Sequence, residues 1–226
     1  MDLVIVGDVN TQEIFSFLDE ELLKYHFNEY QNPILYLEKE TLNPVKEYEA
    51  VECDVSTYQI CYIGKISSDN YDYYKYNKTF TFVLSEMFGF DTPWIQKLIN
   101  KRIIARGLYY GVQGEPYYPS IYVDSITTDP DLLLKKVKQR IKSFKWWMLN
   151  KRTLKRSKKM SIGLSLSKDT VGYYRTKIID TLIYNVDIDD YIKKVNEITL
   201  KDARRFLKVI KNIKYITVIQ KPKTEK

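Results

Sequence analysis

Apolar residues recur every three to four positions along most of the chain, which is the spacing of one buried helix face. The pattern is densest over residues 70–88, where Gly89 then ends the segment. Other stretches begin at a polar residue that can cap a helix, and Thr199-Leu-Lys-Asp202 holds both partners of a capping box. The pattern therefore predicts helices over 10–25, 70–88, 93–106, 128–144, 145–159, 160–185, 187–195 and 199–210.

Shorter runs of β-branched and aromatic residues predict strands between these helices. Residues 26–52 are predicted to form a polar connector, and the pattern leaves open whether it joins the sheet. Segregated helices beside such strands favour an α+β domain with a mostly antiparallel sheet covered by helices. We expect a single domain over 1–226 with a frayed tail at 221–226. The predicted strands are 2–7, 57–66, a loose hairpin of 108–112 with 118–125, and 215–219.

Composition excludes several classes of protein. An apolar content of 44% with 29% charged residues is ordinary for a soluble domain. No stretch approaches the roughly 18–20 apolar residues that span a bilayer, so no membrane partner is expected. Cys53 and Cys61 lie eight positions apart without a metal-binding spacing, and the start of the chain does not resemble a signal peptide. We expect free thiols in a reducing, cytoplasmic compartment.

The net charge of +7 is distributed very unevenly. Residues 1–100 hold 7 Lys and 17 Asp or Glu, a balance of −10, whereas residues 101–226 have a balance of +17. A basic half of this kind is typical of a solvated surface, an attractor for an acidic partner or peptide, or a nucleic-acid site. The segment 145–159 places Trp146 and Trp147 among basic residues, but no nucleic-acid recognition motif surrounds them. A solvated helix with two core tryptophans is favoured, and nucleic acid is not the expected partner.

One short segment has part of a zinc-binding pattern. His26-Phe-Asn-Glu-Tyr30 is similar to HxxEH with the second histidine replaced, and the chain contains a single histidine. A zinc peptidase of this type needs both histidines as ligands and the glutamate to activate water. The match is therefore interpreted as a coincidence, and no metal ligand or cofactor is predicted in this chain.

The segment 96–112 carries the candidate site. An apolar-spaced helix runs through Arg102 to Gly107, which is predicted to adopt the left-handed conformation that ends many helices, and an aromatic strand with Tyr109 and Tyr110 follows. An arginine fork and a phenol can hold a carbonyl or carboxylate by directed hydrogen bonds. The alternative is a helix-to-strand corner at which Arg102 and Arg106 are only solvated.

Five segments, in this order, are similar to those of insulinase-type zinc peptidases, the M16 or pitrilysin-like family. They are the strand and turn Leu3–Asn10, the strand Tyr58–Gly64 with the long helix after it, the segment Leu98–Val112, the step Ser125–Asp131, and the closing helix and strand Ile198–Ile219. Together they cover nearly the whole chain. The resemblance is to the second, non-zinc half of such a peptidase and implies the fold of an M16 half-unit (LuxS/MPP-like).

The resemblance also implies a function. In that family the first half carries the zinc site, and the second half supplies an arginine and a tyrosine seven positions apart that bind substrate near the scissile bond. Arg102 and Tyr109 have that spacing, whereas alignment on Gly107-Leu108 selects Tyr110 and places Ile103 at the arginine position. The implied site residues are Arg102, Tyr109 and Tyr110, with no catalytic residue in this chain alone.

The implied partners are a zinc-bearing M16 half or subunit and a peptide substrate, in a homo- or hetero-oligomer. Zinc is expected in that other half. The alternative function is a catalytically inactive M16-like partner or scaffold subunit.

Overall fold

A mixed five-stranded sheet forms the centre of the computed structural model, which describes residues 5, 7–25, 48–66, 73–113, 119–167, 178 and 188–223. The strand order is β1-β5-β2-β4-β3. β1 pairs parallel with β5, and the other three pairs are antiparallel. The α+β class and the predominance of antiparallel pairing are thus confirmed. The strands are β1 Tyr48–Cys53, β2 Tyr58–Lys65, β3 Tyr109–Gln113, β4 Ser120–Thr127 and β5 Tyr215–Pro222.

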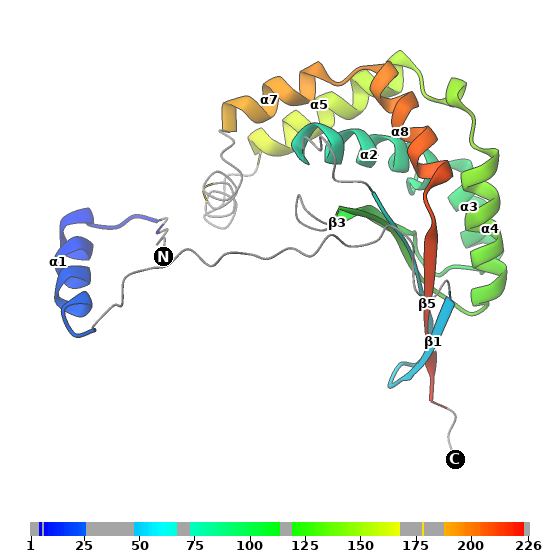
Figure 1. Cartoon of the computed structure of the whole chain (residues 1–226), viewed down its shortest axis with the longest axis horizontal. Coiled ribbons are helices and arrows are strands. Elements are labelled where there is room, and N and C mark those ends of the chain that lie inside the picture. Colours follow the sequence, from blue (N-terminus) through cyan, green and yellow to red (C-terminus); the bar gives the residue numbers. More distant parts are fainter. Residues whose placement is uncertain are drawn as a thin grey trace.

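The described helices α2 to α8 lie along one side of this sheet, and α1 lies apart from them (Figure 1). None of the helices within the described ranges is both long and apolar enough to cross a membrane. The helices are α1 Thr11–Leu22, α2 Tyr73–Phe88, α3 Pro93–Asn100, α4 Pro130–Ser143, the 3-10 turn η1 Trp146–Met148, α5 Lys151–Ser167, α7 Ile188–Glu197 and α8 Leu200–Asn212.

Short polar side chains cap the starts of four helices. The side chains of Asn10, Thr92 and Asp129 each accept a hydrogen bond from a backbone N–H in the first turn of α1, α3 and α4. Thr199 and Asp202 form the complete capping box at the start of α8. Each such bond satisfies a donor that the helix itself leaves unpaired, and so these boundaries can be predicted locally.

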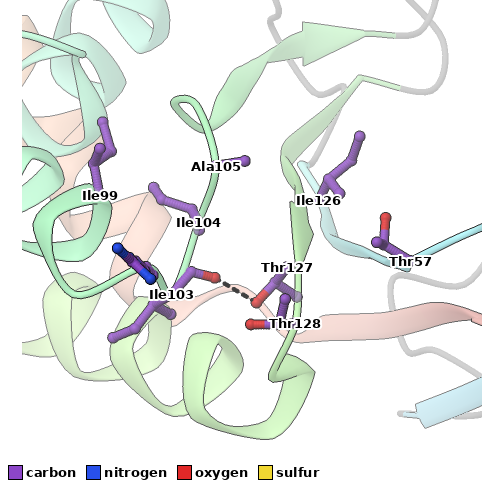
Figure 2. Close-up of a pocket in the computed structure, with 9 residues that line it drawn as sticks. Thr57, Ile99, Ile103, Ile104, Ala105, Ile126, Thr127 and Thr128 are labelled. Carbon is purple, nitrogen blue, oxygen red and sulfur yellow. Dashed lines mark hydrogen bonds between the residues drawn. The ribbon is translucent and has the colours of Figure 1, made fainter.

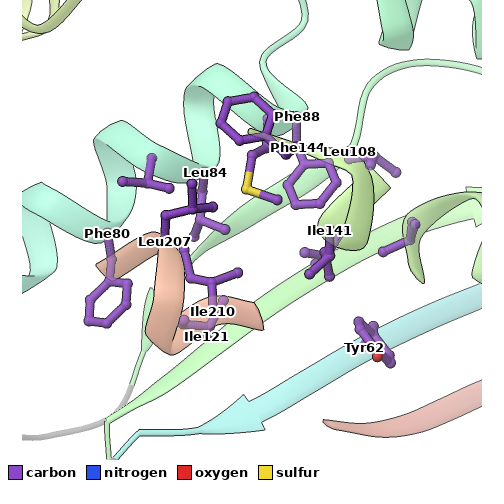
Figure 3. Packing of buried hydrophobic residues seen from close by; sticks show 14 of the residues in the cluster. Tyr62, Phe80, Leu84, Phe88, Leu108, Ile121, Ile141, Phe144, Leu207 and Ile210 are labelled. Atoms are coloured by element: carbon purple, nitrogen blue, oxygen red, sulfur yellow. The ribbon is translucent and has the colours of Figure 1, made fainter. Parts of the chain in front are cut away.

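The core fills the space between the helices and the near side of the sheet (Figure 3). Phe80, Leu84 and Phe88 of α2 are completely buried, and Phe80 packs on Phe206 of α8 with ring centroids 4.3 Å apart. Arg140 of α4 donates from Nε to the carbonyl of Met87 at 3.0 Å. A cation at the end of α2 satisfies orphan carbonyls and the negative end of the helix dipole.

Strand alternation divides the sheet into two faces. The near face, which packs on the helices, includes Ile60, Ile121 and Ile219, each 4% exposed or less. The second face carries the alternate residues, among them Tyr109 and Ile126, which are 62% and 51% exposed. Since successive side chains on a strand point to opposite faces, the register assigns every strand residue to one of these two surfaces.

The structure corrects two sequence-based expectations about elements and answers one question that the sequence left open. The end of the polar connector is strand β1, and β5 runs to Pro222, where the Lys223 N–H donates to the Cys53 carbonyl at 3.2 Å. Residues 221–223 are therefore not a frayed tail. The tryptophan pair is not in the core, because Trp146 and Trp147 are 53% and 59% exposed in η1. The predicted strand 2–7 lies largely outside the described residues.

Candidate functional site

The turn after α3 is built around Arg102. Helix α3 ends at Asn100, six residues before the predicted end. The Ile103 N–H donates to the Leu98 carbonyl at 3.0 Å and the Arg102 N–H donates to the Ile99 carbonyl at 2.8 Å, which is the bonding of a Schellman motif. Its left-handed position, normally a glycine, is Arg102 with φ 55°. The prediction that Gly107 fills this role is wrong.

A left-handed backbone at a non-glycine residue costs about 1–2 kcal/mol. Burial offsets this cost, because Leu98 and Ile103 on either side of the turn are 4% and 8% exposed. Ile103 therefore occupies a core position and Arg102 an exposed one. The side chain that leaves this corner toward solvent is the arginine.

Thr127, at the end of β4, holds the corner in place. Its hydroxyl donates to the Ile103 carbonyl at 2.7 Å (Figure 2). The same hydroxyl accepts from the Asp129 N–H at 3.1 Å. Ile104 also forms an isolated antiparallel bridge with Thr127. These bonds join the Arg102 turn to the sheet and to the start of α4.

Replacing Thr127 by valine is expected to lower the free energy of unfolding by about 1–3 kcal/mol, because the buried Ile103 carbonyl and the Asp129 N–H each lose a partner. Valine keeps the branched shape, so the change tests the hydroxyl. Urea unfolding measures the effect. Thr128→Val is the matched control, since Thr128 is exposed. Equal losses from the two variants would contradict the role of the Thr127 hydroxyl.

Arg102 lines a pocket of about 340 Å³ between the α3 turn and the end of β4 (Figure 2). The lining is mostly apolar, and Ile126 brings the second face of the sheet into it. Within the described residues, the Arg102 guanidinium has no hydrogen-bond or ion-pair partner. The complete lining is Thr57, Ile99, Arg102, Ile103, Ile104, Ala105, Ile126, Thr127 and Thr128.

Tyr109 and Tyr110 point to opposite faces of the sheet because they are successive residues of β3. Tyr110 faces the helices, with its ring centroid 6.4 Å from that of Phe88. Burial, followed by the nearby Asp91 and Glu86 carboxylates, raises the pKa of Tyr110. Tyr109 lies on the second face, 62% exposed, directly opposite Asp124 of β4. The two phenols therefore cannot serve the same site from the same side.

Asp124 gives the second face a polar centre that the sequence patterns did not single out. It lies between Tyr109 of β3 and Cys61 of β2 in the register, and Gln59 Nε2 donates to both of its carboxylate oxygens at 3.3 and 3.2 Å. Burial raises the pKa of Asp124, and the Gln59 hydrogen bonds oppose that rise. Burial and the Asp124 charge raise the pKa of the Cys61 thiol to about 11. The thiol is thus protonated and unreactive at neutral pH.

The raised pKa of Asp124 leads to a prediction of how the free energy of unfolding depends on pH. The folded state favours the protonated carboxyl, so Asp124 contributes stability that is present below its unfolded pKa of about 3.9 and is lost as the pH rises through the folded value. Asp124→Asn, which resembles the neutral form, is therefore expected to unfold at a higher temperature than the wild type at pH 7 and at the same temperature at pH 3.

Calorimetric scans at several pH values measure this difference. Asp54→Asn, at an exposed aspartate between β1 and β2, is the matched control. A wild type that gains stability relative to Asp124→Asn as the pH rises would contradict the prediction.

The described residues do not fit a zinc site. No group of three or more His, Cys, Asp or Glu in the described ranges could hold a metal ion. Cys53 and Cys61 are free thiols, as predicted. His26-Phe-Asn-Glu-Tyr30 lies outside the described residues.

Comparison of the whole fold with solved structures finds M16-like peptidases. A protein assigned as an M16-like peptidase from Alicyclobacillus acidocaldarius matches 96% of this chain with a TM-score of 0.76 and 16% sequence identity. The fold is that of the M16-like peptidases. The M16-like matches also include the inactive peptidase M16 domain from Pseudomonas fluorescens, with a TM-score of 0.59 and 16% identity over 81% of this chain. The sequence matches no protein-family model, and no curated protein sequence matches it either.

The chain spans about half the length of the M16-like peptidases that it matches. It covers 53% of the Alicyclobacillus protein and 45% of the Pseudomonas one. By contrast, the chain covers 96% of an inactive peptidase domain from Bordetella parapertussis, which belongs to a protein assigned as a zinc protease. That match includes 78% of this chain, with a TM-score of 0.57 and 11% identity. The chain thus corresponds in extent to one half-unit of an M16-like fold.

Proposed function

We propose that this chain is the non-zinc, substrate-binding half of an M16-type peptidase and acts together with a zinc-bearing half. One observation carries the proposal: the fold matches 96% of this chain but only about half of a full M16-like peptidase. A half-unit whose described residues lack a metal-binding group needs its catalytic metal from elsewhere. The partner is accordingly a second M16 half, as a separate subunit or in the same polypeptide.

In this proposal the non-zinc half binds the peptide substrate. Arg102 lines a mostly apolar pocket, and its guanidinium has no hydrogen-bond or ion-pair partner among the described residues. Arginine donates several hydrogen bonds in a fixed fork, and a peptide backbone presents carbonyl oxygens that accept them. Negative charge develops on the attacked carbonyl oxygen in the transition state of hydrolysis, and preorganised donors lower its free energy.

Of the two tyrosines, Tyr109 is the partner of Arg102 in this proposal. The Arg102 pocket includes Ile126, and both Ile126 and Tyr109 belong to the second face of the sheet. Tyr110 points toward α2 and packs on Phe88. A peptide lying along the second face can therefore reach Arg102 and Tyr109 together, with the Tyr110 ring beneath the opposite surface.

Reconstitution tests the proposal. The isolated chain is expected to cleave no peptide, with or without added zinc, and to enhance cleavage of a quenched fluorescent peptide library by a zinc-bearing M16 half. A chelator should abolish the activity of the mixture. Chelator-sensitive cleavage by the isolated chain would refute its assignment as the non-zinc half.

A second candidate function is a catalytically silent partner or scaffold subunit with the same fold. It is favoured by the structural neighbours that are themselves described as inactive domains. The two functions differ in one measurement. A scaffold binds the zinc-bearing half without changing the kcat of that half for a short peptide, whereas a substrate-binding half changes it.

A further inference from the structure

The turn η1 holds three consecutive large apolar side chains in solvent. Trp146, Trp147 and Met148 are 53%, 59% and 41% exposed. Phe144 and Leu149, on either side of them, are each 1% exposed, so both ends of the turn are fixed in the core. Consecutive exposed apolar side chains of this size are typical of an interaction surface.

The two indoles are positioned by each other and by cations. Their ring centroids lie 5.8 Å apart in an edge-to-face arrangement. The Arg204 guanidinium of α8 lies 4.6 Å from the Trp146 ring centroid, and Lys145 Nζ lies 6.0 Å from that of Trp147. Each indole therefore has a cation over its ring, and each tryptophan is still more than half exposed.

The segments that form this surface contain no acidic residue. Residues 132–168, which include most of α4, η1 and α5, hold 13 Lys or Arg and no Asp or Glu. Residues 203–223, which include most of α8, likewise hold no Asp or Glu. The positive charge around η1 is thus not balanced by carboxylates from the elements that carry it.

Helix α8 extends the positive charge beside η1. Arg204, Lys208 and Lys211 are spaced by four and three residues, which places them along one side of the helix. Within the described part of the chain, neither these three nor Lys145 is in an ion pair. Burial, followed by the Lys145 ammonium, lowers the pKa of Lys211, so like charges are close together here. We call these four cations and the three residues of η1 the η1 surface.

Two classes of anionic partner combine with tryptophans and cations of this kind, single-stranded nucleic acid and a phospholipid bilayer. Bases stack on open ring faces, whereas here Arg204 and Lys145 lie over the rings, and Met148 has no ring to stack on a base. Indoles and long apolar side chains also enter the head-group level of a bilayer, where neighbouring cations meet lipid phosphates. The η1 surface therefore favours the bilayer.

We propose that the η1 surface binds the anionic surface of a phospholipid bilayer, with the apolar side chains of η1 at the head-group level. Binding of this kind needs no spanning helix, and so it differs from the membrane partner that the lack of long apolar stretches argues against. Helices α4 and α8 lie along one side of the sheet (Figure 1), whereas Tyr109 belongs to the second face. This inference is independent of the proposed peptidase function.

Binding of the full chain to vesicles tests the proposal. The wild type is expected to sediment with sucrose-loaded vesicles of phosphatidylcholine that contain about one third phosphatidylglycerol, and not with pure phosphatidylcholine. High salt should release it, because salt screens the attraction between cations and anionic lipids. Brominated acyl chains should quench its tryptophan fluorescence, since the indoles then lie near the boundary between head groups and acyl chains.

Two double variants separate the apolar and the charged contributions. Trp147→Ser with Met148→Ser is expected to lower the partition coefficient about tenfold or more, because less apolar area enters the bilayer. Lys145→Gln with Lys208→Gln is expected to lower it by a similar factor, since each cation near an anionic bilayer contributes about fivefold. All four residues are exposed, and so neither variant should lower the unfolding temperature.

The control variant carries Lys193→Gln and Lys223→Gln, exposed residues of α7 and of the segment after β5, with the same change in net charge. It is expected to bind vesicles like the wild type. Loss of binding in the control equal to that in the Lys145 and Lys208 variant would overturn the proposal, as would a wild type that does not bind the anionic vesicles. Binding of single-stranded DNA that depends on the same four residues, without vesicle binding, would identify a nucleic-acid surface instead.

Discussion

Replacing Arg102 by alanine in an assembled, active peptidase is expected to lower kcat by about 10²–10³-fold, as the loss of one preorganised donor to a developing oxyanion does. The guanidinium has no other partner within the described residues, and so its removal leaves no buried group unpaired. Turnover of a quenched peptide measures the effect, with binding of the zinc-bearing half measured separately. An unchanged kcat would remove Arg102 from the site.

A glycine at the same position separates the side chain from the backbone. Because the φ angle of 55° suits glycine, Arg102→Gly is expected to raise the free energy of unfolding by about 1 kcal/mol while lowering kcat as much as alanine does. A variant that is more stable and yet inactive cannot be explained by misfolding. Activity retained in Arg102→Gly but lost in Arg102→Ala would instead attribute the effect to the turn.

The adjacent tyrosines form a matched pair for the same assay. Tyr109→Phe removes a hydroxyl from the second face, and Tyr110→Phe removes one from the side that packs on Phe88. We expect the first change to lower kcat and the second to leave it within about twofold. The reverse result would support the alignment on Gly107-Leu108, in which Tyr110 is the substrate-binding tyrosine.

The second large effect is expected in the core. Phe88→Ala should lower the free energy of unfolding by about 3–5 kcal/mol, since the ring is completely buried and packs on Trp94 and Tyr110 with centroids 5.7 and 6.4 Å away. The cavity would also lie beneath β3 and loosen the strand that carries Tyr109.

Phe90→Ala is the control, because that ring is 62% exposed and lies only two residues away. It is expected to change the free energy of unfolding by no more than about 0.5 kcal/mol. Urea unfolding followed by circular dichroism compares the two variants. Similar midpoints would show that Phe88 is not an essential part of the core.

Much of the fold could be predicted because its signals are local. The caps at Asn10, Thr92, Asp129 and Thr199 depend on hydrogen bonds within three residues, and the sequence therefore shows where these helices begin. The end of α3 was predicted six residues too late. Gly107 is of the residue type that commonly ends a helix, and so it was predicted to end α3. In the structure the turn that ends α3 instead holds Arg102 in a left-handed conformation, which only the burial of the surrounding residues stabilises.

The candidate site shows the same limit. The sequence pointed to Arg102, Tyr109 and Tyr110, and their roles in substrate binding stay a prediction. It missed Thr127 and Asp124, because their partners Ile103 and Gln59 lie 24 and 65 residues away. Alternation in the predicted strand 118–125 already placed Asp124 on the face opposite its apolar neighbours, and this was the available signal.

The sequence by itself determined where several helices begin, the α+β class and the resemblance to a non-zinc M16 half, since these follow from spacing, caps and short ordered segments. Only the tertiary structure decided that residues 48–53 join the sheet, that the two tyrosines face opposite sides and that the two tryptophans of η1 face solvent. Strand β1 depends on parallel pairing with β5, more than 160 residues later. The sequence of one segment does not indicate its partner in such a contact, because the contact is stabilised by burial that exists only after the chain has folded.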